Sequence, residues 1–260
     1  MDGDFAGFRR GPRTAPVAVH GPSCAAGVVV SQTAVMTALL LAEEIFLLAH
    51  NEESGKANGT LALDNGLAGA LLLDLAAEEL VAADGSALTA VLGAASHRLL
   101  VSAHAELLQS DKPRTAQHWV NRLPIALKPL RLQVGQSLVE RGVLAEQHQK
   151  VLGLFPTTSW PEVDPAPERE LHHRLTGVLV EDAEPDPRTA LLVSLLRALG
   201  LVRGLVDKEE SKHADSRAKD IARECATATA TSAAVSRSVQ AVQSAIMVVV
   251  IIPTITTTTN

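Results

Sequence analysis

Two basic residues stand beside a predicted helix start, where they could bind an anion. Lys128 and Arg131 flank Pro129, a residue type that favours the first turn of a helix. Because that turn has free backbone N–H groups and the positive end of the helix dipole, two cations there repel the dipole and each other. A phosphate would relieve this repulsion, and a guanidinium can hold it through two parallel hydrogen bonds. The pair predicts an anion site with Arg122 as a further candidate, although solvated surface charges fit the same residues.

An apolar segment that follows a polar turn is the second candidate. Gln147 to Lys150 separates Val143-Leu144 from residues 151–155, a pattern that predicts a β-hairpin. Exposed apolar residues on its second strand would insert into a lipid surface, and Trp160 nearby is a residue type favoured at membrane interfaces. Packed beneath the hairpin, the same side chains would be core, and the sequence leaves both interpretations open. The residues concerned are Val151, Leu152, Leu154 and Phe155.

The remaining polar clusters do not fit a catalytic or metal centre. His172-His173 lie side by side on a predicted helix, so their side chains point about 100° apart and do not easily share one metal ion. Glu43-Glu44 diverge in the same way, and one of them is expected to cap or pair with another element. Ser96-His97 lacks the setting of a catalytic triad, and the sequence contains no dinucleotide, Walker or C-x-x-C motif. We therefore predict no catalytic residue, no metal and no cofactor.

The composition favours a helical protein and disfavours nucleic-acid binding. The 260 residues are 47% hydrophobic and only 2% aromatic, with a net charge of −6. This length and apolar content exclude overall disorder and allow a sizeable core. Proteins that bind nucleic acid need a basic stripe or aromatic stacking platforms, and neither is present. Ala and Leu outnumber the strand-forming residues, which favours helix.

Apolar residues recur at helical spacing over most of the chain and predict a mainly α fold. After Asp64, a good N-cap, leucines recur along one stripe, and small residues such as Gly66 and Ala70 would let another helix approach closely. This helix is therefore predicted to be central in a bundle. The other predicted helices are Met36–His50, Leu99–Leu108, Pro113–Arg122, Pro129–Arg141, Glu168–Val180, Arg188–Val202 and Asp207–Arg223.

The predicted domain lies between two irregular tails. Residues 1–32 predict a flexible arm, residues 33–224 a single helical domain with a small β-hairpin, and residues 225–260 a low-complexity tail. The tail contains the apolar run Ile246–Ile252, which is too short to span a bilayer. Cys24 and Cys225 are the only cysteines, so we expect no disulfide framework and, without a secretory signal, a cytoplasmic protein.

Six segments in a fixed order resemble the Golgi phosphoprotein 3 family. They run over about residues 33 to 222, and Arg outnumbers Lys as in a bacterial-type member. No single segment is specific, but the ordered set with its spacing is fairly specific. The segments are LLLAEEIFLLA at 39–49, GK at 55–56, LAGALLLDLA at 67–76, QHWV at 117–120, LVERGVL at 138–144 and FPTT at 155–158.

The resemblance implies a mostly helical peripheral membrane protein that binds phosphatidylinositol 4-phosphate. The basic pair of the family's headgroup pocket corresponds to Lys128 and Arg131. The pocket's other Arg falls at Ala68 and its aromatic residue near Gly59, so this chain lacks both and retains a general anionic site. The family's hairpin, which inserts into lipid and mediates self-association, corresponds to the apolar strand around Phe155.

We therefore predict a non-enzymatic adaptor at the cytoplasmic face of a membrane, as at the Golgi in eukaryotic relatives. Its expected partners are an anionic phospholipid or phosphoinositide headgroup, the membrane surface and further copies of the chain as a homo-oligomer, but not nucleic acid. The alternative is a cytosolic regulator or scaffold in which Pro129 to Phe155 forms a winged-helix-like segment. A salt-dependent gel shift distinguishes the two, because only the second reading places a helix and wing against DNA.

Overall fold

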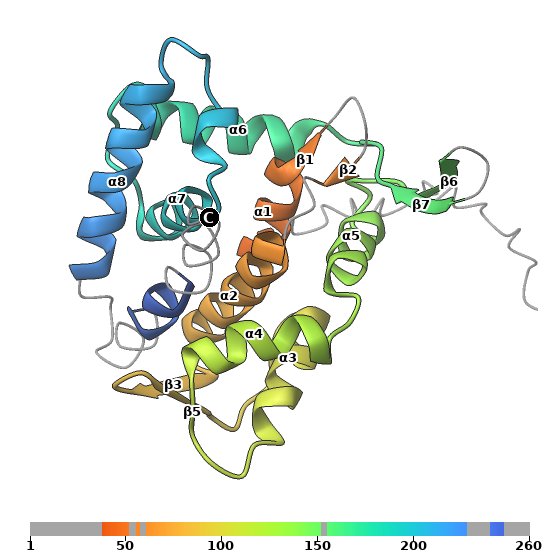
Figure 1. The fold of residues 1–260 in the computed structure, drawn as a ribbon, viewed down its shortest axis with the longest axis vertical. Coiled ribbons are helices and arrows are strands. Elements are labelled where there is room, and N and C mark those ends of the chain that lie inside the picture. The colour runs from red at the N-terminus through yellow and green to blue at the C-terminus, as the bar shows by residue number, and fades with distance from the viewer. Residues whose placement is uncertain (1–37, 52–55, 58–60, 152–154, 228–239, 247–260) are drawn as a thin grey trace, which may run out of the picture. The chain divides into compact units, whose positions relative to one another are not determined.

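Short helices and small antiparallel sheets make up the part of the chain that the structure describes (Figure 1). The computed structural model describes residues 38–51, 56–57, 61–151, 155–227 and 240–246. The predicted mainly α architecture is confirmed. The helices are α1 (Leu41–Ala49), α2 (Leu61–Ala77), α3 (Arg98–Leu108), α4 (Ala116–Ala126), α5 (Leu130–Glu140), α6 (Ala166–Leu179), α7 (Pro187–Ala198), the 3-10 helix η1 (Val202–Gly204) and α8 (Ser211–Thr227). The strands are β1 (His50–Asn51), β2 (Lys56–Ala57), β3 (Val81–Asp84), β4 (Ala87–Ala90), β5 (Arg114–Thr115), β6 (Gln147–Val151) and β7 (Phe155–Ser159).

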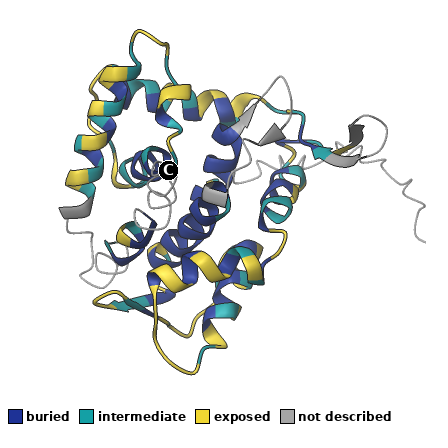
Figure 2. Ribbon diagram, in the orientation of Figure 1, coloured by how far each residue is buried: buried dark blue, intermediate teal, exposed yellow. Residues whose placement is uncertain are grey.

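Helices α1 and α2 form the buried centre of the described residues, drawn in dark blue in Figure 2. Every residue of α1 is buried, and α2 contacts α1, α3, α4 and α5. Leu67, Leu71 and Leu75 of α2 are fully buried, in agreement with the predicted stripe. A Cβ added at Gly66 would come within 2.7 Å of Leu199, and one added at Gly69 would overlap the side chain of Ile246. Both glycines therefore permit close packing against α2.

Two predicted helix ends are confirmed by their caps. Asp186 begins α7 by accepting hydrogen bonds from the backbone N–H groups of Arg188 and Thr189 at 2.9 and 3.0 Å. Pro187 takes the first helical position, where its missing N–H is not needed. Gly142 follows α5 in the left-handed region at φ +75°, a conformation that favours glycine.

Two other helix starts differ from the prediction. Helix α2 begins at Leu61, so Asp64 lies in its first turn and is not the N-cap. Helix α4 begins after Thr115 and not at Pro113, because the Thr115 Oγ1 accepts a hydrogen bond from the N–H of His118 at 3.1 Å. Thr115 caps α4 through the N–H of His118, and Asp64 instead pairs with Arg131 of α5. The composition of the sequence indicates neither contact.

A hairpin is present close to the predicted place, but both of its strands and its turn differ from the expected ones, since the second strand is β7 (Phe155–Ser159) and not residues 151–155. Gln147 pairs with Ser159 and Val151 with Phe155, so the segment 147–150, predicted as the turn, is strand β6. Residues 152–154, between the two strands, lie outside the described part. A two-stranded ribbon with an exposed face can be built from polar residues, which hydrophobic patterning does not recognise.

A second hairpin joins β3 to β4 at the turn predicted around Asp84-Gly85. Gly85 has φ +58°, which a non-glycine residue rarely adopts, and the strands pair from Val81 with Ala90 to Asp84 with Ala87. Strand β5 pairs with β4 at its other edge. Strands β3 and β4 have four residues each and are rich in Ala, and β5 has only two residues, so the sequence predicted only the turn.

Residues 240–246 form a further helix that packs on the domain (Figure 1). Val242 and Ile246 are fully buried, and Ile246 reaches Gly69 of α2. Ile246 begins the apolar run of the predicted tail, and the rest of that run lies outside the described residues. The predicted arm at residues 1–32 lies outside them as well. Within the described part, we found no helix with the length and hydropathy needed to cross a bilayer.

Candidate functional site

Lys128 and Arg131 lie at the start of α5, as their spacing around Pro129 predicted. Pro129 is the N-cap and contributes no side-chain hydrogen bond, and α5 has no acidic residue in its first turn. Lys128 is exposed just before the helix, and Arg131 is its second residue. Two cations therefore stand at the positive end of α5, in a turn whose first N–H groups receive no side-chain cap from Pro129.

The side chain of Arg131 forms a two-pronged ion pair with Asp64 of α2. Its Nε lies 2.6 Å from Oδ1, and its Nη2 lies 3.2 Å from Oδ2. The side chains are 26% and 29% exposed, so solvent reaches both. The negative charge that relieves the repulsion at the start of α5 therefore comes in part from the chain itself. Asp64 lies in the first turn of α2, where its negative charge also interacts favourably with the positive end of that helix.

The other predicted pocket positions do not add cations here. Ala68, one turn beyond Asp64, is fully buried in the core. Gly59 lies outside the described residues. Arg122 lies on α4, with its Nη2 4.0 Å from Glu106 of α3. The site that the described residues form is therefore Lys128, Arg131 and Asp64, where α5 meets α2.

The hairpin places two of its four candidate residues next to its turn. Val151 and Phe155 pair across the ladder, and Leu152 and Leu154 belong to the segment between them that is not described. Trp160, which the sequence suggested for a membrane interface, is only 5% exposed. Its ring packs edge-to-face on Phe46 of α1, with centroids 6.1 Å apart. Trp160 is therefore a core residue, and the interface interpretation of this residue is wrong.

Glu43 is at the centre of one buried polar cluster. Its carboxylate is fully buried and accepts hydrogen bonds from the Leu40 N–H at 2.9 Å and the Ser137 hydroxyl at 2.6 Å. The Arg141 guanidinium lies 3.4 Å from the same carboxylate. This confirms the expectation that one acid of the pair caps or pairs with another element, because Glu43 holds the start of α1 against α5.

His97 completes this cluster but does not form a catalytic triad with it. Its Nδ1 accepts the Leu99 N–H at 3.2 Å as the cap of α3, which leaves the proton on Nε2, 3.2 Å from the Ser137 hydroxyl. Burial lowers the pKa of His97, which keeps the ring neutral. In a triad the histidine accepts the serine proton, whereas here Ser137 donates to Glu43. The hydrogen bonds among Glu43, His97 and Ser137 therefore position α1, α3 and α5 relative to one another.

Glu44 and Asp74 form a second buried cluster with two arginines. Glu44 accepts a hydrogen bond from Arg174 of α6 at 2.8 Å. Asp74 of α2 accepts one from the N–H of Leu41 at 2.9 Å and one from Arg188 of α7 at 3.3 Å. Burial raises the pKa of Asp74 to about 7, against the opposing attraction of Arg188. These contacts join α1, α2, α6 and α7 at the start of α1.

The family of this domain follows from a comparison with known families. A profile described as Golgi phosphoprotein 3 (GPP34) matches residues 41–242. The chain belongs to the Golgi phosphoprotein 3 family. A comparison with curated proteins found no match. The GPP34 match spans α1 to α8, so it includes the basic pair at α5, the ion pair to Asp64 and both buried clusters.

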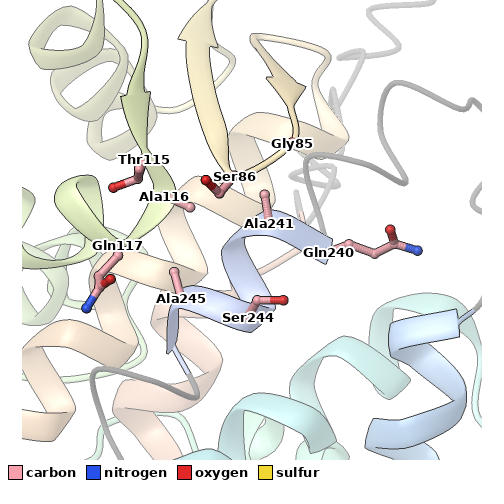
Figure 3. A pocket seen from close by; sticks show the side chains of 9 residues that line it. All are labelled: Gly85, Ser86, Thr115, Ala116, Gln117, Gln240, Ala241, Ser244 and Ala245. Carbon is pink, nitrogen blue, oxygen red and sulfur yellow. The ribbon is translucent and has the colours of Figure 1, made fainter.

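A cavity of about 450 Å³ opens elsewhere in this GPP34 domain, between the β3–β4 turn, the start of α4 and the helix at 240–246. Figure 3 shows Ala241 and Ala245 turned toward the turn and toward α4. None of the described residues that line it is charged. The described part of the chain also contains no cluster of ligating side chains suited to a metal ion.

Proposed function

We propose that this chain is a peripheral membrane adaptor that binds anionic phospholipid headgroups of the phosphatidylinositol 4-phosphate type. Members of the Golgi phosphoprotein 3 family are adaptors that bind this lipid at Golgi membranes. The observation that supports the proposal most directly is the pair Lys128 and Arg131 at the positive end of α5. A helix start that has cations in place of acidic residues is suited to a phosphate.

The proposed mechanism has an electrostatic part and an apolar part. Lys128 is exposed and draws the protein to an anionic surface, while Arg131 offers the geometry for two parallel hydrogen bonds to a phosphate. Each basic residue near such a surface contributes about 1 kcal/mol. The apolar segment of the hairpin adds shallow insertion through Val151, Leu152, Leu154 and Phe155. Because neither part is strong alone, self-association would raise the affinity through avidity.

A vesicle panel tests the proposed ligand. The full chain is sedimented with phosphatidylcholine vesicles, with vesicles that also contain phosphatidylserine, and with vesicles that contain phosphatidylinositol 4-phosphate. The proposal expects binding that is weakest on the first and strongest on the last. Equal sedimentation with all three would refute a headgroup site.

The hairpin is tested separately with the double variant Leu154→Ser and Phe155→Ser. Loss of vesicle binding at an unchanged melting temperature supports insertion of the apolar strand. Loss of the cooperative melting transition instead assigns these side chains to the core. As the matched control, Val163→Ser changes an exposed apolar residue that lies outside the hairpin, and we expect it to bind like the wild type.

A further inference from the structure

We infer that Asp64 competes with the lipid headgroup for Arg131 and so selects headgroups that carry a phosphomonoester. The inference rests on the proposed function, which places the headgroup at Lys128 and Arg131. The carboxylate of Asp64 already takes the Nε and Nη2 protons of Arg131, at 2.6 and 3.2 Å. These are the donors that a phosphate would bind in the same two-pronged geometry.

The position of Asp64 allows it to be displaced. Both side chains of the pair are about one quarter exposed, so an anion from solvent can approach them. Ion pairs that are partly open to solvent add little net stability. Asp64 also lies in the first turn of α2, where it still interacts favourably with the helix dipole after it releases Arg131. Exchange of one anion for another at Arg131 therefore needs no unfolding of either helix.

The charges of the competing anions determine the outcome. Asp64 has one negative charge and is held beside Arg131 by the fold, which gives it a high effective concentration. The phosphodiester of an ordinary phospholipid has a single charge and gains nothing over Asp64. A phosphomonoester has a charge between about −1.5 and −2 near neutral pH and also attracts the exposed Lys128. The site is therefore selective for the more highly charged group.

The test compares Asp64→Asn with Asp84→Asn on phosphatidylcholine vesicles that contain either phosphatidylserine or phosphatidylinositol 4-phosphate. Both variants remove one negative charge and keep the size of the side chain. Asp84 is the control because it is an exposed residue of β3, away from α5. We expect Asp64→Asn to strengthen phosphatidylserine binding by about fivefold over Asp84→Asn. Asp64→Asn should strengthen binding to phosphatidylinositol 4-phosphate by less than this, so the preference for phosphatidylinositol 4-phosphate over phosphatidylserine should fall. An equal gain on both lipids, or none beyond the control, overturns the inference.

Two further arms separate this inference from the proposed function. Adding Arg131→Ala to Asp64→Asn should abolish the gain, and persistence of the gain would show that Asp64 does not act through Arg131. If Asp64→Asn binds through Arg131 while the wild type binds neither vesicle, the role of Asp64 is supported and the proposed function fails. If the wild type binds the vesicles and Asp64→Asn changes nothing, the proposed function is supported and the role of Asp64 is refuted. Inorganic phosphate is then added as a competitor. If the site binds free phosphate, the added phosphate should occupy it and release the protein from the vesicles. If the site also needs the membrane, vesicle binding should persist.

Discussion

The buried carboxyl of Asp74 makes the stability of this domain depend on pH near neutrality. Its pKa is raised by burial to about 7 in the folded chain, against an ordinary value of 3.8. The folded protein therefore binds this proton more tightly than the unfolded chain does. Stability from Asp74 is complete below about pH 4 and is lost as the pH rises through 7. At about 1.4 kcal/mol per unit, the loss between about pH 5 and pH 8 is about 2–3 kcal/mol.

The variant Asp74→Asn isolates this effect. An asparagine keeps the size of the side chain and one oxygen that can accept from the Leu41 N–H or from Arg188, but it cannot ionise. Its absolute stability is expected to be lower, because one of the two donors loses its acceptor. The pH dependence is what the comparison measures. The difference in unfolding free energy between wild type and variant should shrink by about 2–3 kcal/mol as the pH is raised from about 5 to about 8.

Urea denaturation followed by far-UV circular dichroism gives this difference at each pH. The lowered pKa values of His97 and His118 act in the opposite sense, because their neutral forms stabilise the fold until the pH falls below their ordinary value of 6.5. Both histidines are present in wild type and variant, so their contribution cancels in the difference. Parallel curves for the two proteins would refute the assignment of the raised pKa to Asp74.

Two further predictions concern the packing that holds the site. Glu43→Gln removes the negative charge that faces Arg141 and weakens the hydrogen bond that Glu43 accepts from the Ser137 hydroxyl. The unfolding free energy measured by urea denaturation should therefore fall by about 2–4 kcal/mol. An unchanged unfolding free energy would show that this cluster does not stabilise the fold. Gly69→Ala adds a methyl group that overlaps Ile246, so we expect thermal melting to show a loss of about 1–3 kcal/mol. Because Ile246 is buried, Ile246→Ala also destabilises, but it should cost less in the Gly69→Ala background than in the wild type; equal costs would refute the overlap.

The helices were predictable because their apolar spacing is regular, whereas their ends depended on contacts that spacing does not contain. The stripe along α2 and the cap of α7 at Asp186 were both visible in the sequence. The start of α4 at Thr115 depends on one hydroxyl that meets one N–H group. Strand β6 was missed because its polar residues lie in a two-stranded ribbon and show no buried face in the sequence.

The candidate site was predictable only in part for a related reason. The basic residues at α5 and the turn that contains them lie within four positions of one another, so local rules describe them. Asp64 is 67 residues away from Arg131, and no pattern in a single sequence joins them. Glu44 and Arg174 are separated by 130 residues, and only the packing of α1 against α6 brings them together. Long-range ion pairs are set by the fold and not by spacing.

The central claim is that the start of α5 binds an anionic headgroup, and a vesicle titration tests it most directly. The double variant Lys128→Ala and Arg131→Ala is titrated with vesicles that contain phosphatidylinositol 4-phosphate, beside Lys212→Ala on the exposed face of α8. At about 1 kcal/mol for each cation, the double variant should bind roughly 30-fold more weakly than the wild type. The Lys212→Ala control should bind like the wild type. Equal binding by the double variant and the control, with both folded, would contradict the account.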